Sequence, residues 1–363
     1  MGQALRGVCL AALASLTAFA AVAQERPARG VSILVGFGPA QGNDQPARPD
    51  AATLASNRMS PDMSYDQTAR FLARHLGRFL PGAPDVTARH VPGGAGLIAA
   101  RRLSEAAPDG STIALLSSNI IYAAALKLPG AEVSVARFVW LGAVAPDSWG
   151  CIQTRESAGK EKIWAGSLGV GSRADIHARA LRDFMGYPFQ ISNGYTSRFE
   201  LVRAIETGEI DAACGWPSSD IERRRGQWFD TGKMDVVARF SRTNAGLTGP
   251  VLTGPILGGA DLTSTWPQPS TDIAATLGVL SLEAELAWPL AAPPGMALEM
   301  AAAFSDALER IAYDRAALED AMRAGVALDP VSAQTVRNHV AQLMTLPDSA
   351  RKKLADLYGA SGK

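Results

Sequence analysis

The sequence has no excess of charge of either sign. Its 35 Lys and Arg residues balance its 35 Asp and Glu residues, so the formal net charge is zero over 363 residues. A protein without a basic surplus has no general electrostatic attraction for nucleic acid or for an anionic membrane surface. We therefore expect no nucleic-acid partner.

Sequence patterns typical of catalysis and metal binding are also missing. The chain has four histidines but no H-x-x-x-H or H-E-x-x-H arrangement, and it has no C-x-x-C pair. The nucleophile-elbow pattern G-x-S-x-G is absent, and no lysine follows the glycines in the way a P-loop requires. We predict no metal, no cofactor and no enzymatic activity, and we interpret His75 and His339 as solvated helix positions.

Long apolar runs are confined to the N-terminus. Residues 8–22 are apolar, follow one basic residue, and end in an A-x-A pattern at Ala23. This predicts a cleaved secretory signal peptide over residues 1–23 and a soluble, periplasmic mature protein. Cleavage leaves Cys151 and Cys214, which in an oxidising compartment either form a disulfide or remain separate buried thiols.

The mature chain alternates short β-rich runs with amphipathic helical runs, which indicates an α/β fold with largely parallel sheets. The first helix is expected over residues 65–80, with Ser64 and Gln67 as its capping box. A second series starts after Cys151, and a strand and four helices complete the C-terminal region. Expected strands cover residues 31–37, 162–165, 188–192, 210–215 and 286–292; later helices cover 175–185 and 197–208, begin near 297 and 314, and form a terminal pair over 332–358.

A glycine loop joins a strand to a helix within the segment 86–118. In Pro92-Gly93-Gly94-Ala95-Gly96, backbone N–H groups and the positive end of the helix dipole would face a ligand above the sheet. A carboxylate held by main-chain donors is one interpretation. A tight strand-to-helix connection that needs glycine only for its backbone geometry is the other.

Loops of this kind occur in both halves of the chain. They span residues 36–66, 92–96, 166–172 and 193–197, and they predict two lobes that present helix N-termini to a shared cleft. Asp66 and Asp175 lie in first helical turns, where a carboxylate also stabilises the helix dipole. The segment 41–63 is long and rich in proline, and we interpret it as a flap over the cleft or as a surface excursion without a role.

The order of these motifs resembles a known family. SYDQTARFLARHLGRFLPG, HVPGGAGLIAARRLSEAAPDGSTIALLS, FVWLGAV, GEIDAACGWPSSDI and WPLAAPPGM are similar to segments of the extracytoplasmic receptors of tripartite tricarboxylate transporters, the Bug family of solute-binding proteins. The resemblance covers nearly all of the mature chain. It implies a two-lobed type II periplasmic-binding-protein fold with a cleft between two mixed or parallel sheets.

The resemblance also implies a site and a function. The receptor would bind a small organic carboxylate as a monomer and deliver it to membrane transporter subunits. A periplasmic sensor that signals to a membrane histidine kinase and an enzyme on the same fold are the alternatives. The ligand-binding residues carried over by position are Gly38, Ser64, Tyr65, Asp66, Gly93, Gly94, Ala95, Ser118, Asn119, Ser167, Gly171, Ser172, Tyr195, Thr196, Ser197 and Arg198.

Two departures from the family pattern affect this site. The segment 41–63 interrupts the first glycine loop, and Thr196-Ser197-Arg198 replaces a glycine-rich stretch, so Arg198 would supply a charge-assisted bond there. The expected division is lobe 1 over residues 29–149 and 265–363 and lobe 2 over residues 150–264. Cys151 and Cys214 are expected to lie close together where the chain crosses between the lobes.

Overall fold

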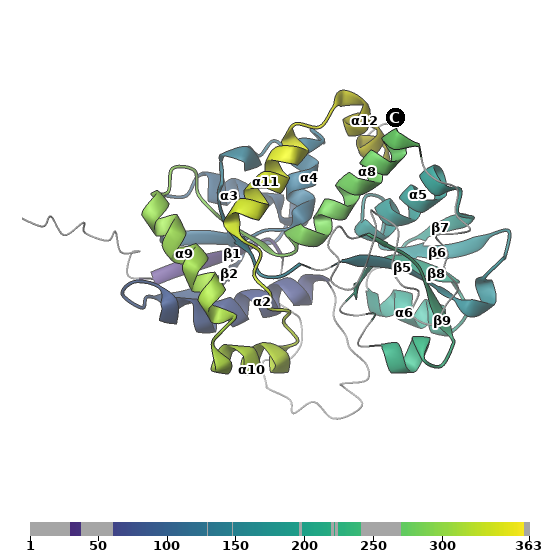
Figure 1. The fold of residues 1–363 in the computed structure, drawn as a ribbon, viewed down its shortest axis with the longest axis horizontal. Helices are drawn as coiled ribbons and strands as arrows, with labels where there is room; N and C mark the ends of the chain where they lie inside the picture. Colours follow the sequence, from purple (N-terminus) through teal and green to yellow (C-terminus); the bar gives the residue numbers. More distant parts are fainter. Residues whose placement is uncertain are drawn as a thin grey trace, which may run out of the picture.

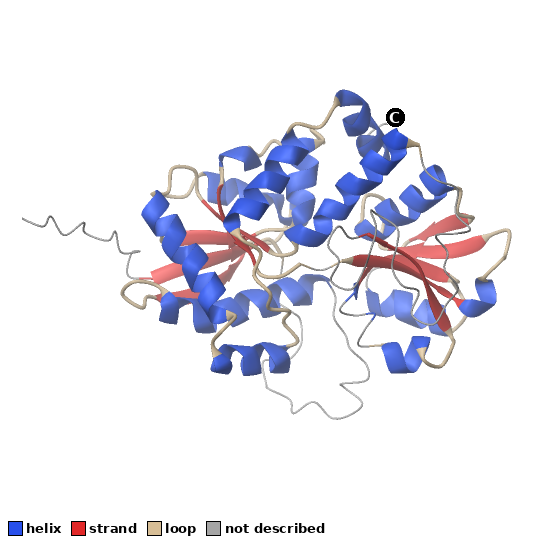
Figure 2. Ribbon diagram, viewed as in Figure 1, coloured by secondary structure: helices blue, strands red, loops and turns tan. Residues whose placement is uncertain are grey.

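The computed structural model describes residues 30–37 and 61–358, apart from 129, 147, 196–197, 219–220, 222–223 and 241–269. Two five-stranded sheets lie side by side, each with helices on both faces (Figures 1 and 2). We call the parts built around them lobe 1 and lobe 2. The predicted signal peptide and most of the segment 41–63 lie outside the described residues. Every helix in the described part is too short or too polar to span a membrane.

The sheet of lobe 1 is mixed. Its strand order is β2-β1-β3-β10-β4, with β1 parallel to β2 and β3, whereas β10 runs antiparallel to both of its neighbours. The strand β10 joins this sheet only after the chain has passed through the described strands of lobe 2. The bounds are β1 (Gly30–Val35), β2 (Asp85–His90), β3 (Thr112–Leu115), β4 (Val139–Ala143) and β10 (Pro289–Ala292).

The sheet of lobe 2 repeats this arrangement with different strands. Its order is β7-β6-β8-β5-β9, with β6 parallel to β7 and β8, and β5 antiparallel to β8 and β9. Each sheet is therefore largely parallel, as expected, and is mixed because one interior strand, β10 or β5, runs antiparallel to its neighbours. The bounds are β5 (Trp149–Thr154), β6 (Ile163–Ser167), β7 (Phe189–Asn193), β8 (Ala212–Pro217) and β9 (Met234–Phe240).

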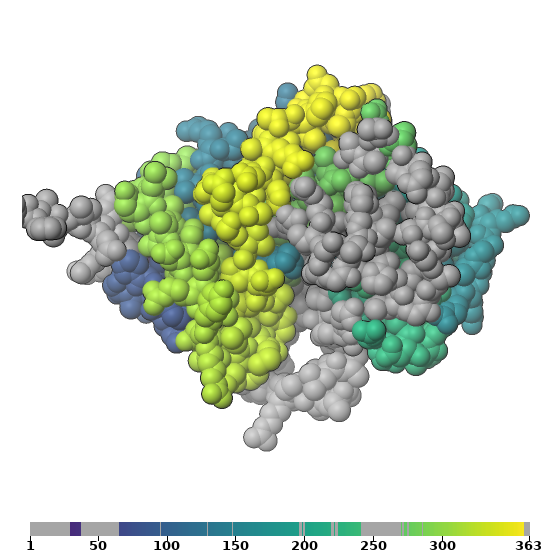
Figure 3. All heavy atoms as spheres, viewed as in Figure 1, coloured from purple at the N-terminus to yellow at the C-terminus, as the bar shows by residue number. Residues whose placement is uncertain are grey.

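Helices of lobe 1 bury apolar residues against both faces of its sheet. One face packs on α2 (Pro61–His75), α9 (Leu298–Ile311) and α10 (Arg315–Ala324). The other packs on α3 (Leu97–Ser104), α4 (Ser118–Ala125) and α11 (Ala333–Met344). The helices α9 and α10 (light green) and α11 (yellow) form much of the lobe 1 surface in Figure 3.

In lobe 2, α5 (Arg173–Met185) covers one face of the sheet, and α6 (Arg198–Glu206) with the π-helix η5 (Arg225–Phe229) covers the other. Between the lobes lie α8 (Thr271–Ser281), the 3₁₀ helix η7 (Leu282–Leu286) and α12 (Asp348–Leu357) (Figure 1). One hydrophobic cluster includes residues of both sheets and of these linking helices, so the two lobes share a continuous core.

Helix boundaries in lobe 1 differ from the predicted ones. The helix α2 begins at Pro61, so Ser64 lies inside it and is not its N-cap. Proline is favoured in the first helical turn because its missing N–H would have no partner there, and this outweighs the S-x-x-Q pattern. Ser118 and Asn119, carried over as ligand-binding residues, begin α4, because the Ser117 hydroxyl accepts from the Asn119 N–H and caps that helix.

Two histidines expected at solvated positions are buried. His75 is 8% exposed, and its Nε2 lies 2.9 Å from Asp320 Oδ2 on α10. His339 is also 8% exposed, on α11. Both predictions were wrong because of contacts that local periodicity does not reveal: α10 returns from the C-terminal part of the chain to pack on α2 beside His75, and α11, which carries His339, packs on β4 and α4.

The disulfide between Cys151 and Cys214 is present in the structure. It joins β5 to β8, two neighbouring antiparallel strands inside the sheet of lobe 2. The predicted position between the lobes is therefore wrong. The predicted boundary would assign Trp149 to lobe 1, but this residue is the first of β5 in the sheet of lobe 2. The other predicted boundary, at 264/265, lies outside the described residues.

Candidate functional site

The N-termini of α4 and α5 meet between the lobes. The helix α4 follows β3 of lobe 1 after a short turn, and α5 follows β6 of lobe 2 through the loop 168–172. Arg173, the first residue of α5, donates from Nη2 to the Ser118 hydroxyl, the first residue of α4, at 3.0 Å. Both helices start at the carboxyl ends of parallel strands, where open α/β sheets bind ligands.

A buried ion pair crosses the same place. Arg173 donates from Nη2 to Glu283 Oε1 at 3.0 Å and from Nε to Glu283 Oε2 at 3.2 Å, which is a bidentate contact. Ser118 Oγ also donates to Glu283 Oε1 at 3.3 Å. The side chains of Arg173 and Glu283 are 16% and 2% exposed. Glu283 belongs to η7, which leads into β10 of lobe 1, so the pair joins the two lobes.

Aromatic rings of lobe 2 surround the cationic side of this pair. The Arg173 guanidinium carbon lies 3.7 Å from the centre of the Trp149 ring, a cation–π contact. His177, one turn along α5, is fully buried and stacks on Phe240 with ring centres 4.0 Å apart. Its Nε2 lies 3.6 Å from Glu283 Oε2.

The charges at this site balance one another. Burial opposes ionisation of Glu283, but the positive charge of Arg173, the nearby His177 imidazole and the hydrogen bonds from Arg173 outweigh it and lower its pKa to about 2. Burial lowers the pKa of His177, so the imidazole is neutral near pH 7. The pKa of Arg173 is raised, because attraction to Glu283 exceeds the cost of burial. Arg173 and Glu283 therefore both stay charged near pH 7, and their ion pair has no net charge.

Two tyrosines, Tyr122 of lobe 1 and Tyr358 at the end of the linking helix α12, lie on the acidic side of the pair. Tyr122 donates to the Val279 carbonyl at 2.5 Å and so ties α4 to the helix that precedes Glu283. Tyr358 stacks on Tyr122, and its buried hydroxyl has no hydrogen-bond partner among the described residues. Burial raises the pKa values of both phenols well above the usual range, so both remain protonated donors.

Two residues predicted from the first lobe 1 loop differ in their contacts. Tyr65 lies near Arg173 and Glu283, whereas Asp66 pairs with residues of its own lobe. Tyr65 hydrogen-bonds to Ser117, and burial raises its pKa. Asp66 pairs within its own lobe, 2.9 Å from Arg70 Nε and from His90 Nε2. Ser64 lies on α2. Gly38 lies outside the described residues.

The glycine loop after β2 has backbone conformations that require glycine. The φ angles of Gly93, Gly94 and Gly96 are 125°, 58° and 95°, all in the left-handed region. A Cβ on Gly36 would lie 2.5 Å from Gly96 Cα, so two lobe 1 loops pack backbone against backbone. These observations account for the glycines as a tight connection. Ala95 lies between them in the 3₁₀ turn, and a ligand role for this loop stays a prediction.

The loop before α5 uses most of its own donors. Gly169 N–H donates to Ser167 Oγ at 3.1 Å, and Gly171 N–H donates to Asp175 Oδ2 at 2.9 Å. Ser172 caps α5 by accepting from the Asp175 N–H. Asp175 and Ser172 thus fix the start of α5, and the side chain that reaches the interlobe centre is that of Arg173.

The second lobe 2 loop, residues 193–197, is only partly described. Tyr195 donates to Glu209 Oε1 at 2.8 Å within lobe 2. The Arg198 guanidinium carbon lies 5.5 Å from the Trp216 ring centre. Thr196 and Ser197 lie outside the described residues. The structure brings together Ser118 and the start of α5, and it leaves Tyr195 directed to a partner of its own lobe.

Sequence reasoning missed Arg173, Glu283, His177 and Trp149. Arg173 follows the Ser172 cap directly, and an arginine at that position is a signal that sequence inspection could have used. Glu283 lies 110 residues further along the chain, within an apolar stretch, and no local pattern marks its partner. No group of three or more His, Cys, Asp or Glu residues suited to a metal occurs among the described residues.

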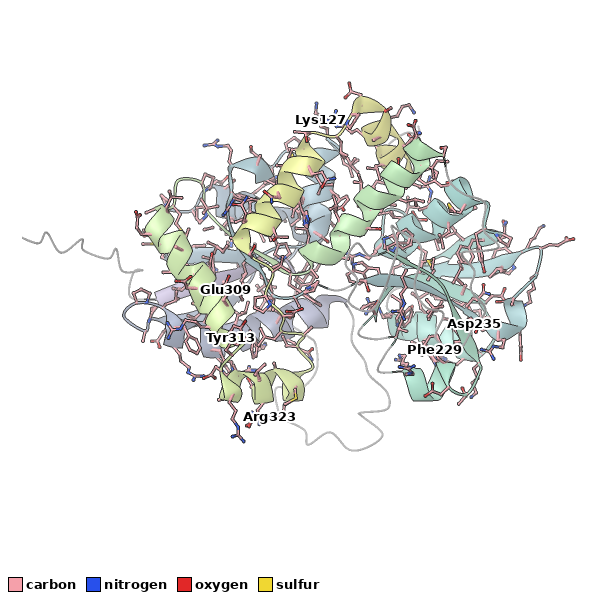
Figure 4. The ribbon with its side chains drawn as sticks, in the orientation of Figure 1. Lys127, Phe229, Asp235, Glu309, Tyr313 and Arg323 are labelled. Carbon is pink, nitrogen blue, oxygen red and sulfur yellow. A yellow bond between two sulfur atoms is a disulfide. The ribbon has the colours of Figure 1, made fainter. Side chains whose placement is uncertain are left out.

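A separate cavity of about 860 Å³ lies in lobe 2, at the end of the strands that is remote from Arg173. Its walls include Thr154 at the end of β5, Met234 at the start of β9, and Trp228 of η5. Figure 4 labels Phe229 and Asp235 in this part of lobe 2. Asp235 pairs with Arg155 at 2.8 Å, an ordinary exposed ion pair. The cavity lies at the other end of the strands from Arg173 and forms no part of the interlobe site.

Comparison with solved structures places the fold. A TctC solute-binding protein from Polaromonas aligns with a TM-score of 0.62 at 15% identity, over 92% of this chain and 99% of that one. The periplasmic binding protein BugD aligns at 0.55 and 16% identity, and MatC from Rhodopseudomonas palustris, solved with bound malate, at 0.54 and 13%; each covers 92% of this chain and 99% of the other. The fold is that of a two-lobed periplasmic binding protein.

Sequence comparison adds nothing to this. No protein-family model matches the chain, and no curated protein matches its sequence. The expectation of a two-lobed binding-protein fold, and the resemblance to TctC- and Bug-type receptors, are confirmed at the level of structure. Identities this low establish the fold, and function has to be argued from the site.

Proposed function

We propose that the protein is an extracytoplasmic receptor that captures a small organic carboxylate between its lobes. The observation that carries the proposal is the group of donors around Glu283. A guanidinium and an imidazole of lobe 2 and a hydroxyl at a helix N-terminus of lobe 1 surround one carboxylate. Such a set favours a carboxylate over a neutral group, because hydrogen bonds to an ionised acceptor are the stronger ones.

The fold supports the same proposal. The structures that align over nearly their whole length are binding proteins, and two of them, MatC and Rpa4515 from R. palustris, were solved with malate and with adipate. Carried to this chain, this suggests a ligand of similar size with at least one carboxylate. We propose that the receptor acts as a periplasmic monomer and delivers its ligand to membrane transporter subunits. No reaction is assigned to it.

A thermal-shift screen tests the proposal. Mono-, di- and tricarboxylates would be compared with their amides at matched ionic strength. A carboxylate at 100 times its dissociation constant should stabilise the fold by about 2.7 kcal/mol, whereas the amide should give no shift. Ser118→Ala should weaken binding, and Glu132→Gln, an exposed partner of Arg101, serves as the matched control. If amides shift the melting temperature as much as the acids do, the carboxylate proposal is wrong.

A further inference from the structure

Glu283 occupies the place that a bound carboxylate would need. Its two oxygens receive both donors of Arg173 and the hydroxyl of Ser118, and His177 Nε2 lies just beyond hydrogen-bond distance. These donors come from the helix starts that face each other between the lobes. The chain therefore fills its own best carboxylate position.

We propose that Glu283 is an internal competitor for the ligand: an incoming carboxylate takes Arg173 and Ser118 from it. Arg173 then selects for the carboxylate, and Glu283 sets the affinity threshold. This inference rests on the proposed function. It adds Arg173 and Glu283 as residues that determine ligand specificity. It also excludes, as ligands, acids that carry one carboxylate and no other polar group.

An internal carboxylate has an advantage over a free one. It is already held close to Arg173 by the chain, so it competes at a high effective concentration and loses little translational freedom on binding. A ligand that offers one carboxylate and nothing else cannot displace it. A ligand that adds a second anionic or hydrogen-bonding group can, because it gains contacts that Glu283 does not make.

Unused polar groups beside the pair are suited to the second half of such a ligand. His177 Nδ1, Trp149 Nε1 and Tyr358 Oη are buried and have no hydrogen-bond partner among the described residues. Asn119 Oδ1, at the start of α4, is in the same condition. Buried polar atoms without partners are uncommon in native structures, and a ligand or water that reaches them is the usual explanation. The ligand class that follows is a small acid with a second polar or acidic group.

The first experiment uses acetate as a free carboxylate. In Glu283→Ala, acetate at about 100 mM should raise the melting temperature more than chloride or acetamide at equal ionic strength, because it refills the vacated position. The wild-type protein and Glu132→Gln should show no such difference. The double variant Glu283→Ala/Arg173→Gln should lose the acetate effect. An equal response to acetate, chloride and acetamide in Glu283→Ala overturns the inference.

The second experiment measures competition with the isosteric variant. For succinate or citrate, whichever shifts the wild-type protein, Glu283→Gln should bind about tenfold more tightly by calorimetry, because one charged competitor is gone. Equal affinities for the two proteins overturn the inference while the proposed function stands. Acetate rescue of Glu283→Ala, with no carboxylate bound by the wild-type protein, refutes the proposed function and leaves the local assignment in place. If Glu283→Ala does not fold, the comparison of Glu283→Gln with Arg173→Gln/Glu283→Gln, in which no net charge is left buried, decides between these outcomes.

Discussion

The two lobes share one strand order but secure their antiparallel strands differently. In lobe 2, β5 is bonded covalently to β8 through Cys151 and Cys214. In lobe 1, the equivalent strand β10 is held to β3 by backbone hydrogen bonds and side-chain packing alone. Ion pairs from α2 to α10, such as Arg74 to Asp320 at 2.8 Å, fasten the outer helices instead. One lobe thus depends on a single strong link, and the other on several weak ones.

Removing the disulfide should have the largest effect. Changing both cysteines to alanine opens a loop of 63 residues, which the chain-entropy estimate values at about 4 kcal/mol of unfolding free energy. Urea unfolding of Cys151→Ala/Cys214→Ala against the wild-type protein measures this. Dithiothreitol should destabilise the wild-type protein and leave the double variant unaffected. A loss below about 1 kcal/mol would show that the sheet of lobe 2 does not depend on the link.

The interlobe ion pair should come next, with a pH dependence that identifies it. The pKa of Glu283 is about 2 in the folded protein against 4.5 as the reference value, so its ionisation contributes about 3 kcal/mol. Because the folded pKa is the lower one, this contribution is complete above about pH 4.5 and is lost as the pH falls toward 2. Glu283→Gln should therefore be less stable than the wild-type protein at pH 7, and the gap should narrow below pH 4.5. A gap that is constant from pH 7 to 3 would contradict this.

A pair of glycines isolates the close contact between β8 and α5. Gly215 and Gly186 have nearly equal φ angles of 67° and 68°, but a Cβ on Gly215 would lie 2.8 Å from the Ala174 N atom, whereas one on Gly186 meets nothing within 4 Å. Gly186→Ala should cost only the left-handed conformation, about 1 kcal/mol. Gly215→Ala should cost about 2 kcal/mol more and should also weaken ligand binding, since it displaces the start of α5. Equal costs for the two variants, by urea unfolding, would mean that the contact relaxes freely.

The smallest effect is expected on the outside of lobe 1. Asp320→Asn removes the charge that faces Arg74 and His75 and should cost about 1 kcal/mol, because the site is only partly shielded from water. Unfolding at low and high salt checks this, since screening should shrink the difference between variant and wild type. A cost that does not change in 1 M NaCl would show that packing, and not charge, holds α10 to α2.

Features with local signals were predictable from the sequence. Gly186 ends α5 as expected, because a left-handed glycine acts within a single turn, whereas the Ser172 cap starts the helix at Arg173, two residues before the expected start. Short β-rich runs predicted strands that correspond to β1, β6, β7, β8 and β10. The antiparallel placement of β10 was not predictable, because its neighbours β3 and β4 are remote in the chain. The contacts of Arg173 with Glu283 and of His75 with Asp320 could not be predicted for the same reason. Each contact joins segments that are remote in the chain and that no periodic pattern connects.

The route of β10 also has a consequence for the order of folding. The described strands of lobe 2 are complete at Phe240, whereas the lobe 1 sheet still lacks residues 289–292 between β3 and β4. During synthesis from the N-terminus, the described strands of lobe 2 can therefore pair while the edges of β3 and β4 that β10 later joins are still unpaired. Long-range pairing of this kind is slow, and open edges invite association with other chains. Lobe 1, which lacks the disulfide, is thus the lobe whose strand edges stay exposed to association with other chains until β10 pairs with β3 and β4.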